Sequence, residues 1–429
     1  MSTEPRLTGR QVLTTWWPLA ASWLLMGTEM TLISATIARL ADAPFHLAAF
    51  GGLVFPMALL IEAPIIMMLA ASTALSTDRA AFDRLLQFCS GLGLALTLVH
   101  ALFAFTPLYD HVLVALIDPP AGAIEPGRLG MRWMLPWTWA IGDRRLHQGL
   151  LIRFERSRAV VVGTLVRLGV MGAVLCAGLI SGTVPGVVVA GAALSAGVLA
   201  EMVSARVLAR PVLAGPLAAA PVGEALTMRR LLAFYLPLAV TPILNLVALP
   251  LGSASIARMP SPLLNLAAWP ATNGLVFMSR SVGIAFNEVV VSLSGRAGAV
   301  PALDRFARWL ALATTAVLGV VALTPLSTLW FGPVAGLDPE LLDVARTALP
   351  LAVLIPALTV YVSLYTGRLV HARATRGIPE SVALSLLVTS GVLLGGALVD
   401  LLPGVQVTLV AFTLGAAAQI LWLRGRQAD

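Results

Sequence analysis

The chain has 429 residues, of which 58% are hydrophobic and only 11% are charged, and its mean hydropathy is +0.90. A soluble domain carries about 25% charged residues, so this composition excludes a large soluble domain and predicts an integral membrane protein. The net charge of +7 comes from 28 basic residues that are all arginine, which we interpret as genome composition and not as a nucleic-acid-binding signal.

In chain order, twelve long apolar runs predict twelve transmembrane helices and therefore an all-α polytopic fold, since each run reaches about 20 residues or more. The runs are 12–38, 44–75, 85–107, 128–152, 159–181, 185–207, 230–256, 262–294, 305–330, 342–368, 378–399 and 402–423. The second and eighth contain Pro56, Pro64 and Pro270, which predicts kinks. Gly163, Gly169 and Gly172 in the fifth are typical of a helix-packing face.

The second half of the sequence repeats the first at a nearly constant offset in residue number. The matching segments are Trp17-Pro18-Leu19 with Leu236-Pro237-Leu238, Leu47-Ala48-Ala49-Phe50 with Leu266-Ala267-Ala268-Trp269, Asp83-Arg84 with Asp304-Arg305, Thr106-Pro107-Leu108 with Thr324-Pro325-Leu326, and Gly149 and Arg158 with Gly367 and Arg376. Duplicated bundles of six spans are typical of secondary transporters. We therefore predict an N-terminal lobe over 1–208, a cytoplasmic linker over 209–229 and a C-terminal lobe over 230–429.

The arginines predict the orientation in the membrane. Four of the 28 lie within spans, and with a cytoplasmic N-terminus five lie in outer segments (Arg39, Arg128, Arg132, Arg258 and Arg346) and the remaining 19 in inner ones. This asymmetry predicts that both termini are cytoplasmic. The arginine-rich, lysine-free composition indicates a bacterial inner membrane.

Charged residues within the spans are the candidate functional residues. Each costs ~2.5–3.5 kcal/mol near the bilayer centre, so a partner, water or a function must offset it. They are Arg144, Arg145, Arg167, Arg280, Glu29, Glu62, Asp143 and Glu288, with Glu201 closer to the cytoplasmic end and Asn287 as a polar neighbour. One interpretation is internal pairing, such as Glu62 with Arg280 or Asp143 with Arg167. The other is that several of them line a wet cavity and bind substrate or a coupling ion.

Two features favour a substrate site. By the offset of the repeat, Glu62 corresponds to Ser281, next to Arg280. The run from Asp143 to His147 places four polar residues around one helix, and these cannot all face one neighbour. Because guanidinium groups bind carboxylates and phosphates, the arginines predict an anionic substrate. The sequence shows no phosphate loop, metal-ligand cluster or catalytic triad, so we expect no enzyme and no cofactor, and transport driven by an H⁺ or Na⁺ gradient.

The two six-span repeats, with Pro-Leu opening each half, resemble the multidrug and toxic compound extrusion (MATE) fold of the MOP flippase superfamily. Within it, the sequence is most similar to the progressive ankylosis protein family. The segments that carry this resemblance are Met26-Gly27-Thr28-Glu29, the stretch from His147 to Arg153, Arg229 to Leu238, and the stretch from Ser279 to Asn287.

The resemblance implies two lobes that rock to expose a central cavity alternately, and export of organic anions such as ATP, citrate or pyrophosphate. It places the family's first-span acid at Glu29 and its eighth-span arginine at Arg280. The acids that drug-exporting members use for cation coupling are matched only by Glu29 and Glu288, and the long polar C-terminal tail of the animal proteins is absent.

The sequence therefore predicts a monomeric alternating-access exporter of small organic anions. Arg280, Arg144, Arg145, Arg167 and Asn287 would bind the substrate, and Glu29, Glu62, Asp143 and Glu288 would gate the path or carry the coupling ion. One alternative is a proton- or sodium-coupled multidrug antiporter that uses Glu29, Glu62 and Glu288. A second is a flippase for a lipid-linked precursor, and a membrane-embedded transferase ranks last.

Overall fold

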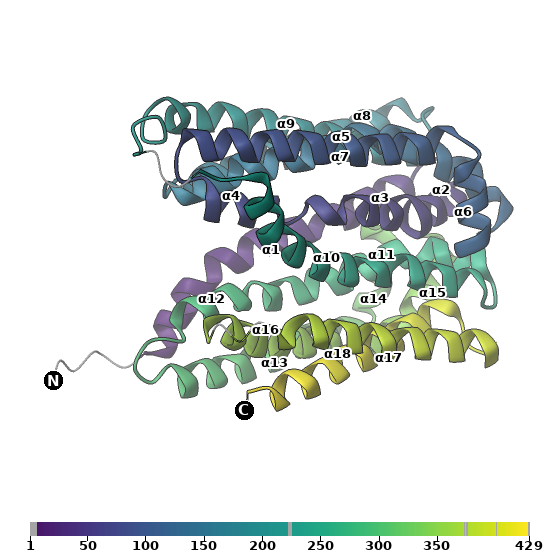
Figure 1. Ribbon diagram of the computed structural model, residues 1–429. Helices are drawn as coiled ribbons and strands as arrows, with labels where there is room; N and C mark the ends of the chain where they lie inside the picture. Colours follow the sequence, from purple (N-terminus) through teal and green to yellow (C-terminus); the bar gives the residue numbers. More distant parts are fainter. Residues whose placement is uncertain (1–6, 222–224, 373, 375, 400, 428–429) are drawn as a thin grey trace. The chain divides into compact units, whose positions relative to one another are not determined.

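The computed structural model describes residues 7–221, 225–372, 374, 376–399 and 401–427, and within these ranges it is helical with no strand (Figure 1). The helices before the middle of the chain are α1 (Gly9–Ile37), α2 (Ala43–Leu47), α3 (Phe55–Glu62), α4 (Met68–Leu75), α5 (Arg79–Phe105), α6 (Leu108–Leu116), α7 (Ala121–Arg153), α8 (Ser157–Ser181) and α9 (Gly186–Ala214). Those after it are α10 (Met228–Ala257), α11 (Pro262–Ile284), α12 (Phe286–Leu293), α13 (Ala299–Leu323), α14 (Leu326–Leu329), α15 (Pro339–Ala348), α16 (Ile355–His371), α17 (Gly377–Val399) and α18 (Gly404–Gly425).

Twelve segments of the described chain are long enough to span a bilayer. Nine are both long and apolar, and the bent pair α15 and α16, which meet at 43°, makes a tenth. The other two are α1 and α7, which have 29 and 33 residues and are less apolar than the nine. At 1.5 Å per residue both exceed the ~30 Å hydrocarbon core. The all-α fold with twelve long helices predicted from the sequence is confirmed.

The second long segment is irregular, as its prolines predict. A π-helical stretch (Ala48–Val54) precedes α3, and a 3₁₀ turn (Ala63–Ile65) separates α3 from α4 at Pro64. In the eighth segment, by contrast, Pro270 lies inside the continuous α11, and the interruption occurs at Ala285, between α11 and α12. Glu62 and Arg280 each lie close to one of these breaks, where backbone groups lose regular helical partners.

The chain forms two compact units. One contains residues 1–39 and 251–429, and the other contains residues 40–250. The first unit joins α1 to the second half of the sequence, through close packing of α1 on α11 at Gly27 and Met278. The two units therefore contain other segments of the chain than the two predicted lobes do. The lobes describe how the sequence repeats, and they stay a prediction. In the predicted linker 209–229, α9 continues to Ala214, and residues 222–224 lie outside the described ranges.

The internal repeat is visible in matching local geometry. Thr106 and Thr324 each donate a 2.6 Å hydrogen bond to the carbonyl four residues earlier, and each accepts a 3.3 Å bond from the amide two residues later. Asp42 and Ser261, which correspond in the repeat, precede equivalent helices with φ of 53° and 52°. Non-glycine residues rarely adopt this left-handed conformation, so its recurrence at the same offset supports a duplication.

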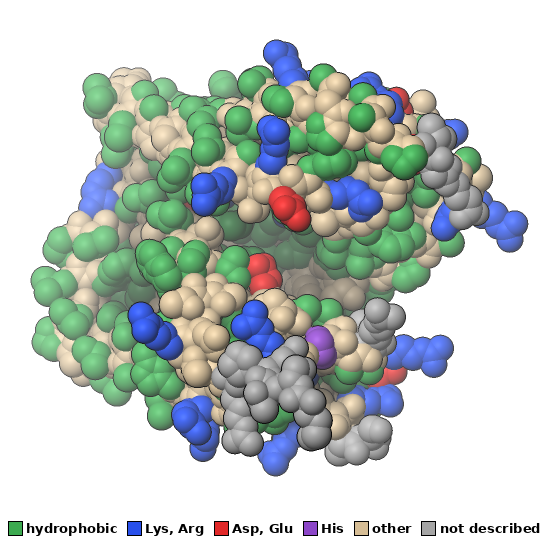
Figure 2. Space-filling view, turned by 90° about the vertical axis from the view of Figure 1, so that its left-hand side faces the viewer, with side chains coloured by type: hydrophobic (Ala, Val, Ile, Leu, Met, Phe, Trp, Pro, Cys, Tyr) green, Lys and Arg blue, Asp and Glu red, His purple; other side chains and the backbone are tan. Residues whose placement is uncertain are grey.

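Helix ends that carry arginines meet at one end of each unit. In the unit of residues 40–250, Arg153 at the end of α7 donates to the carbonyls of Thr73 and Ala74 at the end of α4. In the other unit, Arg368 near the end of α16 pairs with Asp304 at the start of α13, at 2.8 Å. Figure 2 shows arginine side chains, in blue, and few acidic ones, in red, on the surface that it presents. In each unit, an arginine thus ties together two helix ends; the asymmetry of the arginines between the two sides of the membrane stays a prediction.

Candidate functional site

The most densely bonded polar group in the unit of residues 40–250 is the carboxylate of Glu201 on α9, which is 1% exposed. Arg144 Nη1 on α7 lies 2.5 Å from Glu201 Oε2, and Arg167 Nη1 on α8 lies 3.4 Å from the same oxygen. The other oxygen, Oε1, accepts bonds from Gln148 Nε2 at 3.0 Å and Thr164 Oγ1 at 3.3 Å. Two helices, α7 and α8, therefore supply the donors that bind the carboxylate of α9.

The two arginines that bind Glu201 lie well inside their helices, away from the helix ends. Arg144 lies nine residues before the end of α7, and Arg167 lies ten residues after the start of α8. At 1.5 Å per residue, both lie about 14–15 Å from the arginine-rich ends of their helices.

Arg145 and Glu62 add further charges to the same network. Glu62 is 2% exposed and interacts electrostatically with Arg145, Arg144 and Arg167. Within the described residues, neither Glu62 Oε2 nor Arg145 Nε has a hydrogen-bond partner, and Arg145 makes no ion pair. We call Arg144, Arg145, Arg167, Glu62 and Glu201 the arginine cluster; it contains three guanidinium groups and two carboxylates.

Asp143 forms a separate ion pair. Its two oxygens accept hydrogen bonds from Arg206 Nε and Nη2 on α9 at 2.7 and 2.8 Å. His147 Nδ1 lies 3.4 Å from Asp143 Oδ2 and 2.9 Å from the Asp143 carbonyl oxygen. The sequence-based pairing of Asp143 with Arg167 is wrong, because Asp143 faces Arg206 while Arg167 reaches Glu201.

The remaining candidates, Arg280, Glu29, Asn287 and Glu288, lie in the other unit. Arg280 packs its guanidinium over the Phe277 ring, 5.5 Å from its centroid, and its Nε has no hydrogen-bond partner among the described residues. Asn287 Nδ2 donates to the Ser363 carbonyl at 3.2 Å and so links α12 to α16. Glu288 is exposed, and its carboxylate accepts a hydrogen bond from the side chain of Trp23. The predicted pairing of Glu62 with Arg280 joins residues of different units and stays a prediction.

Glu29 lies on α1, which packs closely against α11. A Cβ added at Gly27 would lie 3.0 Å from the Met278 Cα, and one added at Gly274 would lie 3.3 Å from Thr31 Oγ1. The two helices are therefore antiparallel, with Glu29 about one turn from the level of Arg280. The Glu29 side chain is 9% exposed.

Sequence reasoning identified Glu201 only as an acid near the cytoplasmic end of its span, and it missed the partners of Glu201, including the donors Gln148 and Thr164. The sequence does contain a pattern that indicates these donors, because Gln148 follows Arg144 by four residues and Arg167 follows Thr164 by three. Residues at these spacings share a helix face, so each of two adjacent spans presents an arginine beside a neutral donor. Glu201 is the single acidic residue of the predicted sixth span, 185–207.

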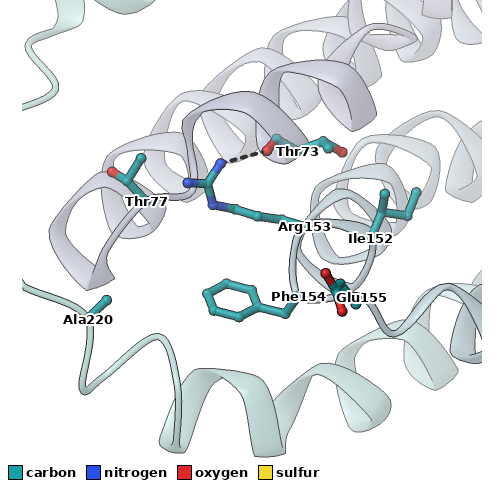
Figure 3. Close-up of a pocket in the computed structure, with 7 residues that line it drawn as sticks. All are labelled: Thr73, Thr77, Ile152, Arg153, Phe154, Glu155 and Ala220. Atoms are coloured by element: carbon teal, nitrogen blue, oxygen red, sulfur yellow. Dashed lines mark hydrogen bonds between the residues drawn. The ribbon is translucent and has the colours of Figure 1, made fainter. Parts of the chain in front are cut away.

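A pocket of about 670 Å³ lies at the arginine-rich end of the same unit. It is lined by Thr73, Thr77, Ile152, Arg153, Phe154, Glu155 and Ala220 (Figure 3). The Arg153 guanidinium crosses it and donates to the Thr73 carbonyl at 2.9 Å, which ties the end of α7 to the end of α4. Among the residues that the structure describes, no group of three or more His, Cys, Asp or Glu side chains is arranged to hold a metal ion.

No protein-family model matches the sequence, and no curated protein matches it. Solved structures do match. An inward-facing MATE family multidrug resistance transporter of the MOP superfamily aligns with TM-score 0.76 at 14% identity, over 96% of this chain and 98% of that one. The lipid II flippase MurJ in an inward closed conformation aligns with TM-score 0.73 at 10% identity, over 96% and 87%.

A mutant of the Vibrio cholerae MATE transporter VcmN aligns with TM-score 0.67 at 16% identity, over 98% of this chain and 97% of that one. At these identities the likeness shows the fold, which is that of MATE and other MOP superfamily transporters.

Proposed function

We propose that this chain is a secondary active transporter that works by alternating access and exports small organic anions bearing carboxylate or phosphate groups. Its substrate-binding residues would be Arg144, Arg145 and Arg167 in the unit of residues 40–250, and Arg280 and Asn287 in the other unit. The fold similarity to transporters supports the transport activity, and the arginines support the charge of the substrate.

The observation that carries the anion proposal is the incomplete pairing of Arg145. Charges within a bilayer are costly and are paired or functional. The arginine cluster holds one guanidinium more than it holds carboxylates, and Arg145 has no ion-pair partner among the described residues. An anion is the ligand that completes such a set, because forked guanidinium donors match carboxylate and phosphate oxygens.

The acidic residues would set the gate or carry a coupling H⁺ or Na⁺. Glu62 is suited to this role because it is buried, has an oxygen without a partner among the described residues and lies in the field of the three arginines. Glu29 and Glu288 would serve the other unit, while Asp143 holds Arg206 in place. Transport by a monomer in the inner membrane, with both termini cytoplasmic, belongs to the same proposal.

The test is uptake of labelled citrate and labelled ATP into proteoliposomes under imposed pH or sodium gradients. We expect Arg145→Gln and Arg280→Gln each to reduce the initial rate by about tenfold or more, because a charge-assisted contact is worth roughly 1.5–3 kcal/mol. Arg346→Gln is the matched control, since Arg346 forms an exposed pair with Asp343. Unchanged anion uptake in both test variants would contradict the proposal.

A multidrug antiporter is the second candidate, favoured by the fold similarity to a multidrug resistance MATE transporter. In that case a cationic dye would move in the same proteoliposomes, and Glu29→Gln or Glu288→Gln would abolish its movement while the arginine variants retained it.

A flippase for a lipid-linked precursor is a third candidate, favoured by the similarity to MurJ. It would move a fluorescent lipid-linked pyrophosphate across the bilayer and leave free citrate and ATP outside.

A further inference from the structure

The donors around Glu201 form a complete binding site for a carboxylate. Both oxygens are bonded, Oε2 by Arg144 and Arg167 and Oε1 by Gln148 and Thr164. Two of these donors are cationic and two are neutral, which is a typical set for holding a carboxylate or phosphate group away from water.

The four donors belong to helices other than the one that carries the carboxylate. Arg144 and Gln148 lie one turn apart on α7, and Thr164 and Arg167 lie one turn apart on α8, whereas Glu201 lies on α9. Removing the carboxylate therefore leaves the donor set in place. A carboxylate or phosphate of another molecule would meet the same four donors.

The net charge of the arginine cluster limits the charge of the substrate that it can bind while Glu201 stays bound to Arg144 and Arg167. The three guanidinium groups of the cluster face two carboxylates, Glu62 and Glu201, so they leave one positive charge. A substrate with two or more negative charges would exceed that charge in a medium of low dielectric, where like charges repel strongly. If Glu201 releases Arg144 and Arg167, two positive charges become available to the substrate.

We propose that Glu201 is an internal occupant of the anion site, and that a carboxylate or phosphate group of the transported substrate displaces it from Arg144 and Arg167. The inference rests on the proposed function and names the contact that substrate binding breaks. A tethered carboxylate competes at high effective concentration, so it lowers the apparent affinity for the substrate and favours its release.

The test measures anion binding to purified protein in detergent, with acetate and inorganic phosphate as probes. The readout is the melting temperature at constant ionic strength, with chloride salts as the reference. We expect Glu201→Ala to melt lower than wild type, because it leaves Arg144 and Arg167 without their carboxylate. Acetate or phosphate should restore its melting temperature, with a half-saturating concentration about tenfold or more below that of wild type.

Two further variants make the test specific. Glu201→Gln keeps the size of the side chain and removes its charge, so it should also bind phosphate about tenfold more tightly than wild type. It remains informative if Glu201→Ala does not fold. Glu380→Ala is the control, because Glu380 forms an exposed pair with Arg426 and should leave phosphate binding unchanged. If neither Glu201 variant binds acetate or phosphate more tightly than wild type, the proposal is overturned and the network is purely structural.

The outcomes separate this inference from the proposed function. Tighter phosphate binding by the Glu201 variants, without citrate or ATP transport by wild type, would retain the anion site and reject anion export. Citrate or ATP transport that depends on Arg145, without tighter binding in the Glu201 variants, would retain anion export and reject displacement of Glu201.

Discussion

At the scale of single residues, the buried charges fall into two groups. Glu201 and Asp143 have hydrogen-bond partners on both oxygens, so their desolvation is offset within the protein. Arg145 and Arg280 each keep a guanidinium nitrogen without a partner among the described residues. A fully bonded ion pair is costly to break, whereas Arg145 and Arg280 form no ion pair among the described residues, which is why we propose them as ligand-binding residues.

The bond between Asp143 and Arg206 belongs to the structural group. We expect Arg206→Gln to lower the stability of the protein by about 1–3 kcal/mol, because Asp143 then keeps a buried charge without its bidentate partner. Thermal unfolding in detergent checks this, with Arg210→Gln as control, since Arg210 is exposed one turn further along α9. A double variant, Asp143→Asn with Arg206→Gln, should recover part of the loss; equal melting temperatures for Arg206→Gln and Arg210→Gln would show that the pair contributes nothing.

The sequence predicted which residues of the arginine cluster matter better than it predicted their partners. Arg144, Arg145, Arg167 and Glu62 were identified because charges are rare in apolar spans. Their partners depend on the rotation of each helix about its axis, since a change of one residue turns a side chain by ~100°. Arg206 illustrates the limit: the positive-inside pattern places it with the cytoplasmic arginines, yet its side chain reaches back to the buried Asp143.

At the scale of helices, close packing depends on a few glycines at matching places of the two repeats. A Cβ added at Gly149 would lie 2.5 Å from the Leu69 carbonyl oxygen, and one added at Gly367 would lie 3.0 Å from the Asn287 carbonyl oxygen. The two glycines correspond to each other in the repeat, and each would bring its Cβ against a backbone carbonyl of a neighbouring helix. Backbone atoms cannot move aside as a flexible side chain can, so only glycine fits at these two contacts.

The glycines of the fifth predicted span behave differently from the packing face that the sequence indicates. A Cβ at Gly163 would touch only Glu201 Cγ, at 3.4 Å, and one at Gly169 or Gly172 would meet no atom within 4 Å. Small residues in a span are compatible both with close packing and with a lipid-facing surface, and composition does not separate the two.

This contrast gives a matched pair of substitutions. We expect Gly149→Ala to lower stability by about 1–3 kcal/mol, because α7 must move away from α4. Gly169→Ala on α8 should be neutral or stabilising by about 0.5–1 kcal/mol, because alanine is the better helix former and has open space. Melting temperatures of the two variants in detergent check this; a lower value for Gly169→Ala than for Gly149→Ala would refute the packing argument.

At the scale of the whole chain, the apolar runs predicted the number of spans, and the matching segments predicted the repeat. Neither predicted which segments form the compact units. A repeat shows which segments are equivalent and not which of them pack together. The association of α1 with α11 depends on the contacts at Gly27 and Gly274, and on the bond from Trp16 Nε1 to the Val282 carbonyl at 2.9 Å. The sequence pattern gives no signal for such contacts between segments that lie so far apart along the chain.

The repeat also predicts one orientation for both halves, because each contains an even number of spans. Most arginines lie in the segments predicted to be on one side of the membrane, whereas the segments predicted on the other side carry acidic residues such as Asp110 and Glu340. By the positive-inside rule, we expect the arginine-rich ends to face the cytoplasm. Exposed positions that lie between or at the ends of helices, and that are suited to cysteine labelling, are Ala219 and Ala374 at the predicted inner ends and Ala121 and Glu340 at the outer ones.

Single cysteines at these positions test the orientation in a background that carries Cys89→Ala and Cys176→Ser. With a membrane-impermeant maleimide on intact cells, Ala121→Cys and Glu340→Cys should be labelled, whereas Ala219→Cys and Ala374→Cys should react only after permeabilisation. Inverted vesicles should give the opposite pattern. Labelling of Ala219→Cys together with Glu340→Cys on intact cells would mean that the two halves have opposite orientations. The repeats would then be related by an axis in the membrane plane. In that case, an arginine of one half would no longer lie at the same membrane depth as its counterpart in the other.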